Sequence, residues 1–118
     1  MLIAFENDRP LQGLIGELDW RFNGHFTRLL KQQVLTGSEG ESIYCPLSWN
    51  EDTFHFLVIG GGFLNSEIER PARSLKLFDL ALQKLDELKL TRMAASRKDW
   101  NLPEIHVGAQ ERNLWLVD

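Results

Sequence analysis

The sequence contains a single cysteine, Cys45, so it cannot form a disulfide within the chain. The absence of disulfides fits a reducing compartment. No apolar stretch approaches the roughly 18 residues that a membrane span requires. The first residues also lack the basic segment and the long apolar run of a signal peptide. We therefore expect a cytoplasmic protein that has no membrane partner.

The chain also has no excess of basic residues. The formal net charge is −4, with 13 lysines and arginines against 17 acidic residues. Proteins that bind nucleic acid through its phosphates usually carry a clustered positive surface. The short basic group Arg92, Arg97 and Lys98 is typical of a solvated loop or strand end. The charge pattern therefore predicts no nucleic-acid partner.

What the chain does have is the composition of one globular domain. It has 118 residues, of which 43% are hydrophobic and 25% are charged. A domain of this length buries roughly 65% of its extended-chain surface, which is enough for one ordinary core. We find no repeat, linker or low-complexity segment, so residues 1–118 are expected to form a single domain.

The first part of the chain predicts a strand followed by helix. Residues 2–5 form an apolar run suited to a short buried strand. Asp8 could then cap a helix, and Pro10 suits a first helical turn. Apolar residues recur at spacings of three and four as far as Leu30. Glycines weaken this pattern, so two helices with a break near Asn23-Gly24 are an alternative to one.

Two strands are expected next. Residues 36–40 and 49–52 are turns, and residues 42–47 form the strand between them. Residues 53–59 form the clearest strand, and its last four apolar residues are typical of a strand covered on both faces. The glycines Gly60, Gly61 and Gly62 are expected to end this strand in a sharp turn.

The second half predicts a long helix and then short strands. Ser66 and Glu69 have capping-box spacing, whereas Pro71 would place the helix start later. The apolar stripe of this helix consists of Ala72, Leu75, Phe78, Leu82 and Leu85. Strands are expected at 90–95, 105–107 and 114–117, with a loop at 101–104. The order β, α, β, β, α, β, β, β favours the α/β class, with helices packed on a mixed sheet.

No catalytic residue, metal ligand or cofactor is predicted. The histidines His25, His55 and His106 have no metal-ligand spacing from one another or from Cys45. His55 is expected to be half-buried in a strand, and Cys45 is expected to act as a small hydrophobic residue. The paired carboxylates lie in predicted turns and on helix surfaces, where they are solvated.

Two segments are candidate binding sites. A glycine turn between a strand and a helix can present backbone N–H groups to an anion, so Gly60, Gly61, Gly62, Asn65 and Ser66 are candidate ligand-binding residues. The alternative is that the chain merely turns there. Trp20 and Arg21 form a candidate partner-binding patch, or else Trp20 fills the interface between helix and sheet.

The order of several short motifs resembles the amino-terminal domain of the leucyl aminopeptidase family. The motifs are Pro10-Leu11-x-Gly13, Leu18-Asp19, Gly24, Leu29-Leu30, Gly37-x-x-Gly40-Glu41 and Leu57-Val58-Ile59-Gly60-Gly61-Gly62. They span roughly residues 8–88. The family's turns usually have lysine where this chain has Ser38, and an apolar residue in place of Gly61.

The resemblance implies a three-layer α/β/α, macrodomain-like form with a mixed, mostly parallel sheet. In the family, catalysis belongs to a separate carboxy-terminal domain with a two-metal site and an N-T-D-A-E-G-R-L motif, and that motif is missing from these 118 residues. The resemblance thus implies a stand-alone, non-catalytic interaction or regulatory module with a protein partner. The alternatives are a macrodomain-type binder of a nucleotide or ADP-ribose near Gly60–Gly62, and an accessory subunit of a metallo-aminopeptidase.

Overall fold

The computed structural model describes residues 1–90 and 92–117, which form a mixed α/β fold. Strand β3 (Asp52–Gly62) lies at the centre of a three-stranded sheet, with β1 (Leu2–Phe5) parallel to it and β2 (Ser42–Trp49) antiparallel to it. Strands β4 (Ala94–Ser96) and β5 (Trp115–Val117) form a separate parallel pair. The terminal amine of Met1 donates to the Ala94 carbonyl oxygen at 2.6 Å, so β4 starts beside the start of β1.

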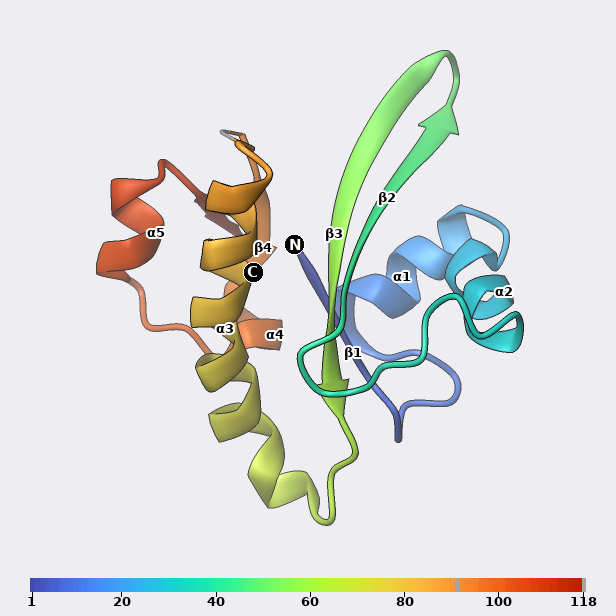
Figure 1. Ribbon diagram of the computed structural model, residues 1–118, viewed down its shortest axis with the longest axis horizontal. Coiled ribbons are helices and arrows are strands. Elements are labelled where there is room, and N and C mark those ends of the chain that lie inside the picture. Colours follow the sequence, from blue (N-terminus) through green and yellow to red (C-terminus); the bar gives the residue numbers. More distant parts are fainter. Residues whose placement is uncertain (91, 118) are drawn as a thin grey trace.

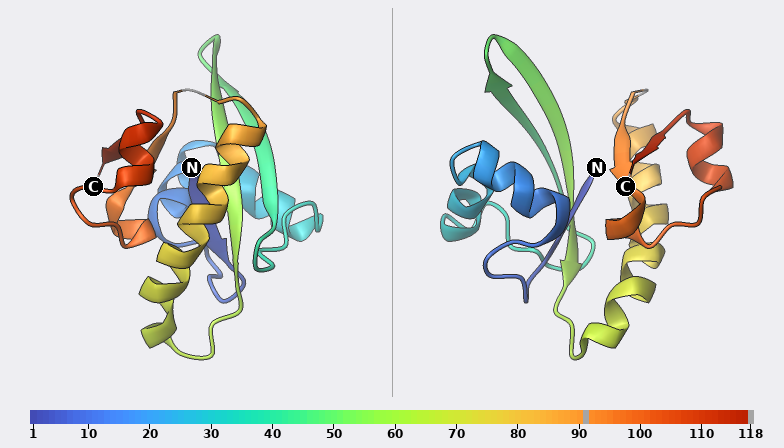
Figure 2. Two further views of the ribbon diagram at one scale, coloured as in Figure 1. Left: turned by 60° about the vertical axis from the view of Figure 1, so that its left-hand side comes forward. Right: turned by 180° about the vertical axis from the view of Figure 1, so that it is seen from behind.

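Helices lie on both sides of the three-stranded sheet (Figures 1 and 2). Helices α1 (Gly13–Arg21) and α2 (His25–Lys31) lie on one side. The short 3₁₀ helix η1 (Glu67–Glu69) leads into α3 (Arg70–Glu87), which covers the other side together with α4 (Arg97–Trp100) and α5 (Val107–Glu111). This arrangement confirms the α/β class that the sequence predicts.

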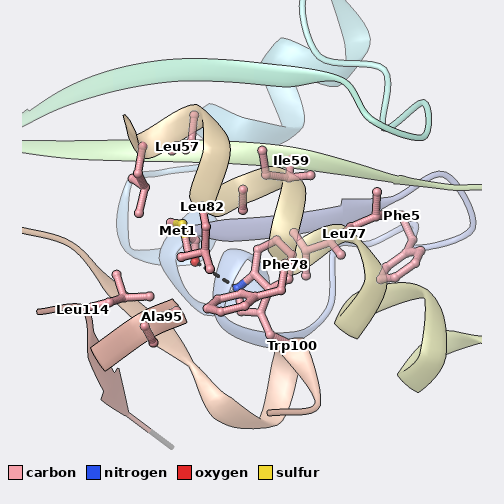
Figure 3. Packing of buried hydrophobic residues seen from close by; sticks show 14 of the residues in the cluster. Met1, Phe5, Leu57, Ile59, Leu77, Phe78, Leu82, Ala95, Trp100 and Leu114 are labelled. Carbon is pink, nitrogen blue, oxygen red and sulfur yellow. Dashed lines mark hydrogen bonds between the residues drawn. The ribbon is translucent and has the colours of Figure 1, made fainter. Parts of the chain in front are cut away.

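The alternation of side chains along a strand produces a core on each side of the sheet. Leu57 and Ile59 belong to the cluster that α3 and α4 complete with residues such as Phe78 and Trp100 (Figure 3). Val58, which lies between them, belongs to the opposite cluster with residues of α1 and α2. The apolar end of β3 is therefore covered on both faces, as its sequence predicts.

The predicted start of the first helix is wrong, whereas the predicted break is confirmed. Helix α1 begins at Gly13 rather than near Asp8, because the Asp8 carboxylate forms an ion pair with Arg70 and is not a cap. Asn23 and Gly24 both have positive φ angles, of 56° and 77°, and this left-handed backbone ends one helix before α2 begins.

The predicted turn at Gly60–Gly62 is also wrong, because these glycines are buried inside β3. The Gly60 amide donates to the Glu41 carbonyl oxygen at 2.7 Å, and the Gly62 amide donates to the Gly37 carbonyl oxygen at 2.7 Å. A Cβ on Gly60 would lie 2.0 Å from the carbonyl oxygen of Ser38. Glycine is thus required here because the loop before β2 passes close to the backbone at the end of β3.

Helix α3 begins at Arg70 with Pro71 in its first turn, as the later of the two predicted starts requires. Its buried face is rotated relative to the predicted stripe. Phe78, Leu82 and Leu85 are buried as expected, but Ala72 and Leu75 are exposed. The face is completed instead by Ser74, Leu77 and Ala81. Because Ser74 is polar, the pattern of apolar residues alone does not reveal which face of α3 is buried.

The last third of the chain differs most from the prediction. The strand expected at 90–95 is shorter and lies at Ala94–Ser96; its predicted residue 91 is outside the described residues. The strand expected at 105–107 is wrong, since the His106 side chain caps α5 by accepting from the Ala109 amide. Arg97 and Lys98, expected in a loop or strand end, belong to α4, which the Ser96 hydroxyl caps.

The buried amine of Met1 makes the stability of the fold depend on pH. Burial lowers the pKa of this amine from 8.0 to about 5. The unfolded chain therefore binds a proton between pH 8 and pH 5 that the folded chain does not. We expect the free energy of unfolding to be highest above pH 8 and to fall as the pH drops to 5. Urea titrations across this window measure the effect, and a flat profile would contradict it.

Candidate functional site

A large groove lies between the end of α1 and the β2–β3 hairpin, with a volume of about 1070 Å³. We call it the aromatic groove. It includes both residues of the predicted partner-binding patch, Trp20 and Arg21. Its lining residues are Pro10, Leu11, Gly16, Leu18, Asp19, Trp20, Arg21, Phe22, Asn23, Gly24, Trp49, Phe54 and Phe56.

Trp20 is the most exposed aromatic residue of the groove. Its exposed fraction is 84%, so the alternative in which Trp20 fills the interface between helix and sheet is wrong. Trp49 and Phe54 are 47% and 44% exposed. Tryptophan and its neighbouring arginine, Arg21, are residue types enriched at the energetic centres of protein interfaces. The groove thus offers three exposed aromatic side chains beside a cation.

The floor of the groove is an aromatic cluster centred on Phe22, which follows the last residue of α1. The Phe22 ring packs edge to face against Trp49, Phe54 and Phe56, with ring centroids 5.9, 6.2 and 5.7 Å apart. Edge-to-face packing is a favoured geometry for aromatic pairs. The cluster therefore holds the end of α1 against the hairpin and fixes the shape of the groove.

The hairpin places Trp49 and Phe54 through a tight turn. Trp49 pairs with Asp52, so only Asn50 and Glu51 connect the two strands. Both have positive φ angles, of 49° and 71°, as a two-residue turn matching the strand twist requires. The hairpin extends beyond the rest of the molecule (Figure 1). Its tip therefore carries exposed aromatic residues out to one wall of the groove.

Local hydrogen bonds fix the other wall. The Asp19 Oδ1 atom accepts from the Thr27 amide at 2.9 Å, which ties α1 to α2. The Gly24 amide donates to the Asp19 carbonyl oxygen at 2.7 Å. These contacts hold the segment after Trp20 in a defined path. The groove is therefore shaped by contacts within the fold itself.

The predicted ligand-binding residues do not come together as an anion site. The amides of Gly60 and Gly62 donate to protein carbonyls, as described above. The Asn65 amide donates to Glu69 Oε2 at 2.9 Å, and the Ser66 hydroxyl accepts from the Ile68 amide at 3.3 Å. These four groups are used in the sheet and in the start of η1. The amides of Gly60, Gly62 and Asn65 are therefore already paired within the protein.

Among the residues that the structure describes, the other side chains considered for catalysis or metal binding do not form a site. His55 is exposed rather than half-buried, and its Nδ1 atom is hydrogen-bonded to the Tyr44 hydroxyl, whose ring stacks on it. Cys45 is buried, and this burial raises the pKa of its thiol. Across residues 1–90 and 92–117, no group of three or more histidine, cysteine or acidic side chains could hold a metal ion.

Sequence reasoning missed the contribution of Phe22, Trp49 and Phe54 to the groove. The sequence predicts a turn at Trp49 and a strand at Phe54, and it indicates no binding role for either residue. A signal was present, because Trp49 and Phe54 lie near the ends of two strands joined by a short turn. What the sequence could not show is that Phe22, 27 residues before Trp49, packs against both rings.

Neither the protein-family models nor the curated proteins compared with this chain give a match. Within the described residues, no helix combines the length and the apolar character needed to cross a membrane.

Proposed function

We propose that this chain is a non-catalytic interaction module that binds a protein partner through the aromatic groove. The observation that carries the proposal is the exposure of Trp20, 84%, at the edge of a preformed aromatic cavity. A tryptophan is seldom so exposed, because its large apolar surface gains free energy when it is buried. A partner that covers Trp20, Trp49 and Phe54 supplies that gain.

The proposal keeps the resemblance to the amino-terminal domain of leucyl aminopeptidases as its framework. Helices on both sides of the sheet support a three-layer, macrodomain-like form. In this framework the protein acts in the cytoplasm, and a metallo-aminopeptidase for which the chain is an accessory subunit is one candidate partner. The alternative of a nucleotide or ADP-ribose binder at Gly60–Gly62 has lost support, because the amides of Gly60 and Gly62 are already paired.

Replacing Trp20 with alanine is expected to weaken partner binding strongly without changing the fold. Loss of a tryptophan at an interface centre costs about 2 kcal/mol or more, which is roughly a thirtyfold loss of affinity. The immobilised chain, incubated with extract of its source cell, provides the measurement. Quantitative mass spectrometry then compares the proteins retained by the wild type and by Trp20→Ala.

Trp115→Ala is the matched control. Trp115 is 74% exposed, but it lies on β5 and does not line the groove. The proposal requires a protein that the wild type and Trp115→Ala retain equally and Trp20→Ala does not. Equal retention by the wild type and both variants, or no reproducible partner, would contradict it. Recovery of a metallo-aminopeptidase would identify the chain as an accessory subunit.

A second expectation concerns catalysis by the chain alone. The purified protein should not hydrolyse leucine p-nitroanilide in the presence of manganese. The reason is that its described histidine, cysteine and acidic side chains form no group of three that could hold a metal ion, and a two-metal peptidase needs more ligands than that. Turnover above the background rate, surviving further purification, would show that the chain is an enzyme.

A further inference from the structure

A second cavity, separate from the aromatic groove, lies where several strands end and helices begin. Its volume is about 590 Å³. We call it the strand-end cavity. It is lined by Ile3, Phe5, Asp8, Gln12, Gly13, Glu67, Arg70, Pro71, Ser74, Lys98, Asp99 and Asn101. No residue of this set lines the aromatic groove, so the two hollows are independent.

The position of this cavity follows from the topology. Phe5 ends β1, and Lys98 and Asp99 follow the end of β4, which starts beside β1. The chain leaves β1 toward α1 on one side of the sheet, whereas α3 and α4 lie on the other (Figure 2). A crevice opens where chains leave neighbouring strands toward opposite sides, and α/β proteins bind ligands in such crevices.

A buried hydroxyl without a partner marks the inner wall. Ser74 is 1% exposed, and its Oγ atom has no hydrogen-bond partner among the described residues. A serine inside a helix commonly bonds to the carbonyl four residues earlier, and Ser74 does not. Burying a hydroxyl that has no hydrogen-bond partner costs free energy. A ligand group that bonds to Ser74 removes this cost.

The charges of the cavity argue against an anionic ligand. Its lining contains three carboxylates, Asp8, Glu67 and Asp99, and two cations, Arg70 and Lys98. The charge of Arg70 is already paired with two carboxylates, since its guanidinium donates to both oxygens of Asp8 and both oxygens of Glu67 at 2.7–2.9 Å. Lys98 is the other cation of the lining, and the net charge of the lining is negative. A phosphate would therefore be repelled.

The polar groups that remain suit hydroxyls. Asp99 uses Oδ2 to accept from the Leu14 amide at 2.9 Å, which leaves its Oδ1 as an acceptor. Lys98 forms no ion pair with the described residues, and its ammonium is a donor. Gln12 and Asn101 add side-chain amides, which both donate and accept. Hydroxyl groups also donate and accept, so they can pair with each of these.

We propose that the strand-end cavity binds an uncharged sugar ring, either as a free sugar or as a nucleoside, with a polar ligand atom bonded to Ser74. The apolar side of the ring lies toward Ile3 and Pro71. Its hydroxyls lie toward Lys98 and Asp99. This site differs from the proposed docking surface, so neither proposal depends on the other.

Binding is tested by NMR titration of the full chain with D-ribose, D-glucose and adenosine, and with AMP and ADP-ribose as charged counterparts. We expect saturable shifts at the cavity residues with at least one uncharged probe. AMP and ADP-ribose should bind more weakly than adenosine. Tighter binding of the phosphates, or no saturable shift with any uncharged probe, would overturn the proposal.

Ser74→Ala tests the role of the buried hydroxyl. It removes an unsatisfied polar atom, so the melting temperature should not fall, whereas affinity for the bound probe should drop about tenfold. Ser48→Ala, at an exposed position on β2, serves as the control and should leave affinity unchanged. If Ser74→Ala folds and binds the probe as well as the wild type does, the hydroxyl has no role in binding and the assignment is wrong.

Discussion

Replacing Leu57 with alanine should lower the free energy of unfolding by about 2–5 kcal/mol, the range found for truncation of fully buried leucines. Leu57 is 1% exposed and lies at the centre of the three-stranded sheet. Its side chain belongs to the cluster between the sheet and α3 (Figure 3). Because sheet and helix both constrain this site, the core cannot close around the missing atoms. Urea unfolding followed by circular dichroism measures the change.

Leu75→Ala provides the matched control for this prediction. Leu75 belongs to the predicted apolar stripe of α3, yet it is 39% exposed in the structure. Its truncation loses much less buried surface, so it should cost under about 1 kcal/mol. Similar losses for the two variants would mean that the stripe predicted from the sequence, rather than the observed face, packs on the sheet. A near-zero loss for Leu57→Ala would contradict its central position.

The elements predicted well are those with a strong local signal. The run from Phe56 to Ile59 is apolar at every position and is followed by glycine, which is typical of a short strand covered on both faces. The helix from Pro71 onward has both a start signal and a long periodic pattern. In each case nearby residues determine the conformation, and reading along the chain is sufficient to find it.

The elements predicted badly depend on distant partners. Strand β4 is shorter than predicted, and its Ala94 carbonyl oxygen accepts from the terminal amine of Met1, which lies 93 residues away. Asp8 looks like a helix cap but pairs with Arg70, which lies 62 residues away. A local pattern contains no information about such contacts. The same limit explains why the prediction for the end of the chain was weakest.

The candidate site was predicted only in part, for the same physical reason. The sequence indicates Trp20 and Arg21 as candidates but does not decide whether Trp20 is exposed, since tryptophan is more often buried. The aromatic groove needs the hairpin tip to meet the end of α1. The strand-end cavity likewise needs Phe5, Ser74 and Asp99, which lie far apart in the chain. Sites built from several elements appear only once the chain is folded.

The glycines at the end of β3 show how one motif can be interpreted in two ways. A glycine turn between a strand and a helix can present backbone amides to an anion, so the sequence predicts a turn at Gly60–Gly62 that either binds a ligand or merely redirects the chain. The structure shows a different requirement. The backbone of residues 37–41 passes beside Gly60, with the Gly40 amide donating to the Gly60 carbonyl oxygen at 3.0 Å. A side chain at Gly60 would therefore meet backbone atoms rather than open space.

Gly60→Ala should consequently destabilise the fold by about 3 kcal/mol or more, at the upper end of overpacking effects. The added Cβ would lie 2.0 Å from the Ser38 carbonyl oxygen, and a backbone atom in a hydrogen-bonded segment cannot move aside cheaply. Thermal unfolding measures the loss. Gly24→Ala is the control, because its Cβ would meet only Arg28 Nη1, at 3.8 Å. This variant should lose only the free energy that a side chain costs in a left-handed backbone, about 1–2 kcal/mol. If Gly60→Ala is no less stable than Gly24→Ala, the glycine run does form an open turn, and a ligand site there becomes tenable again.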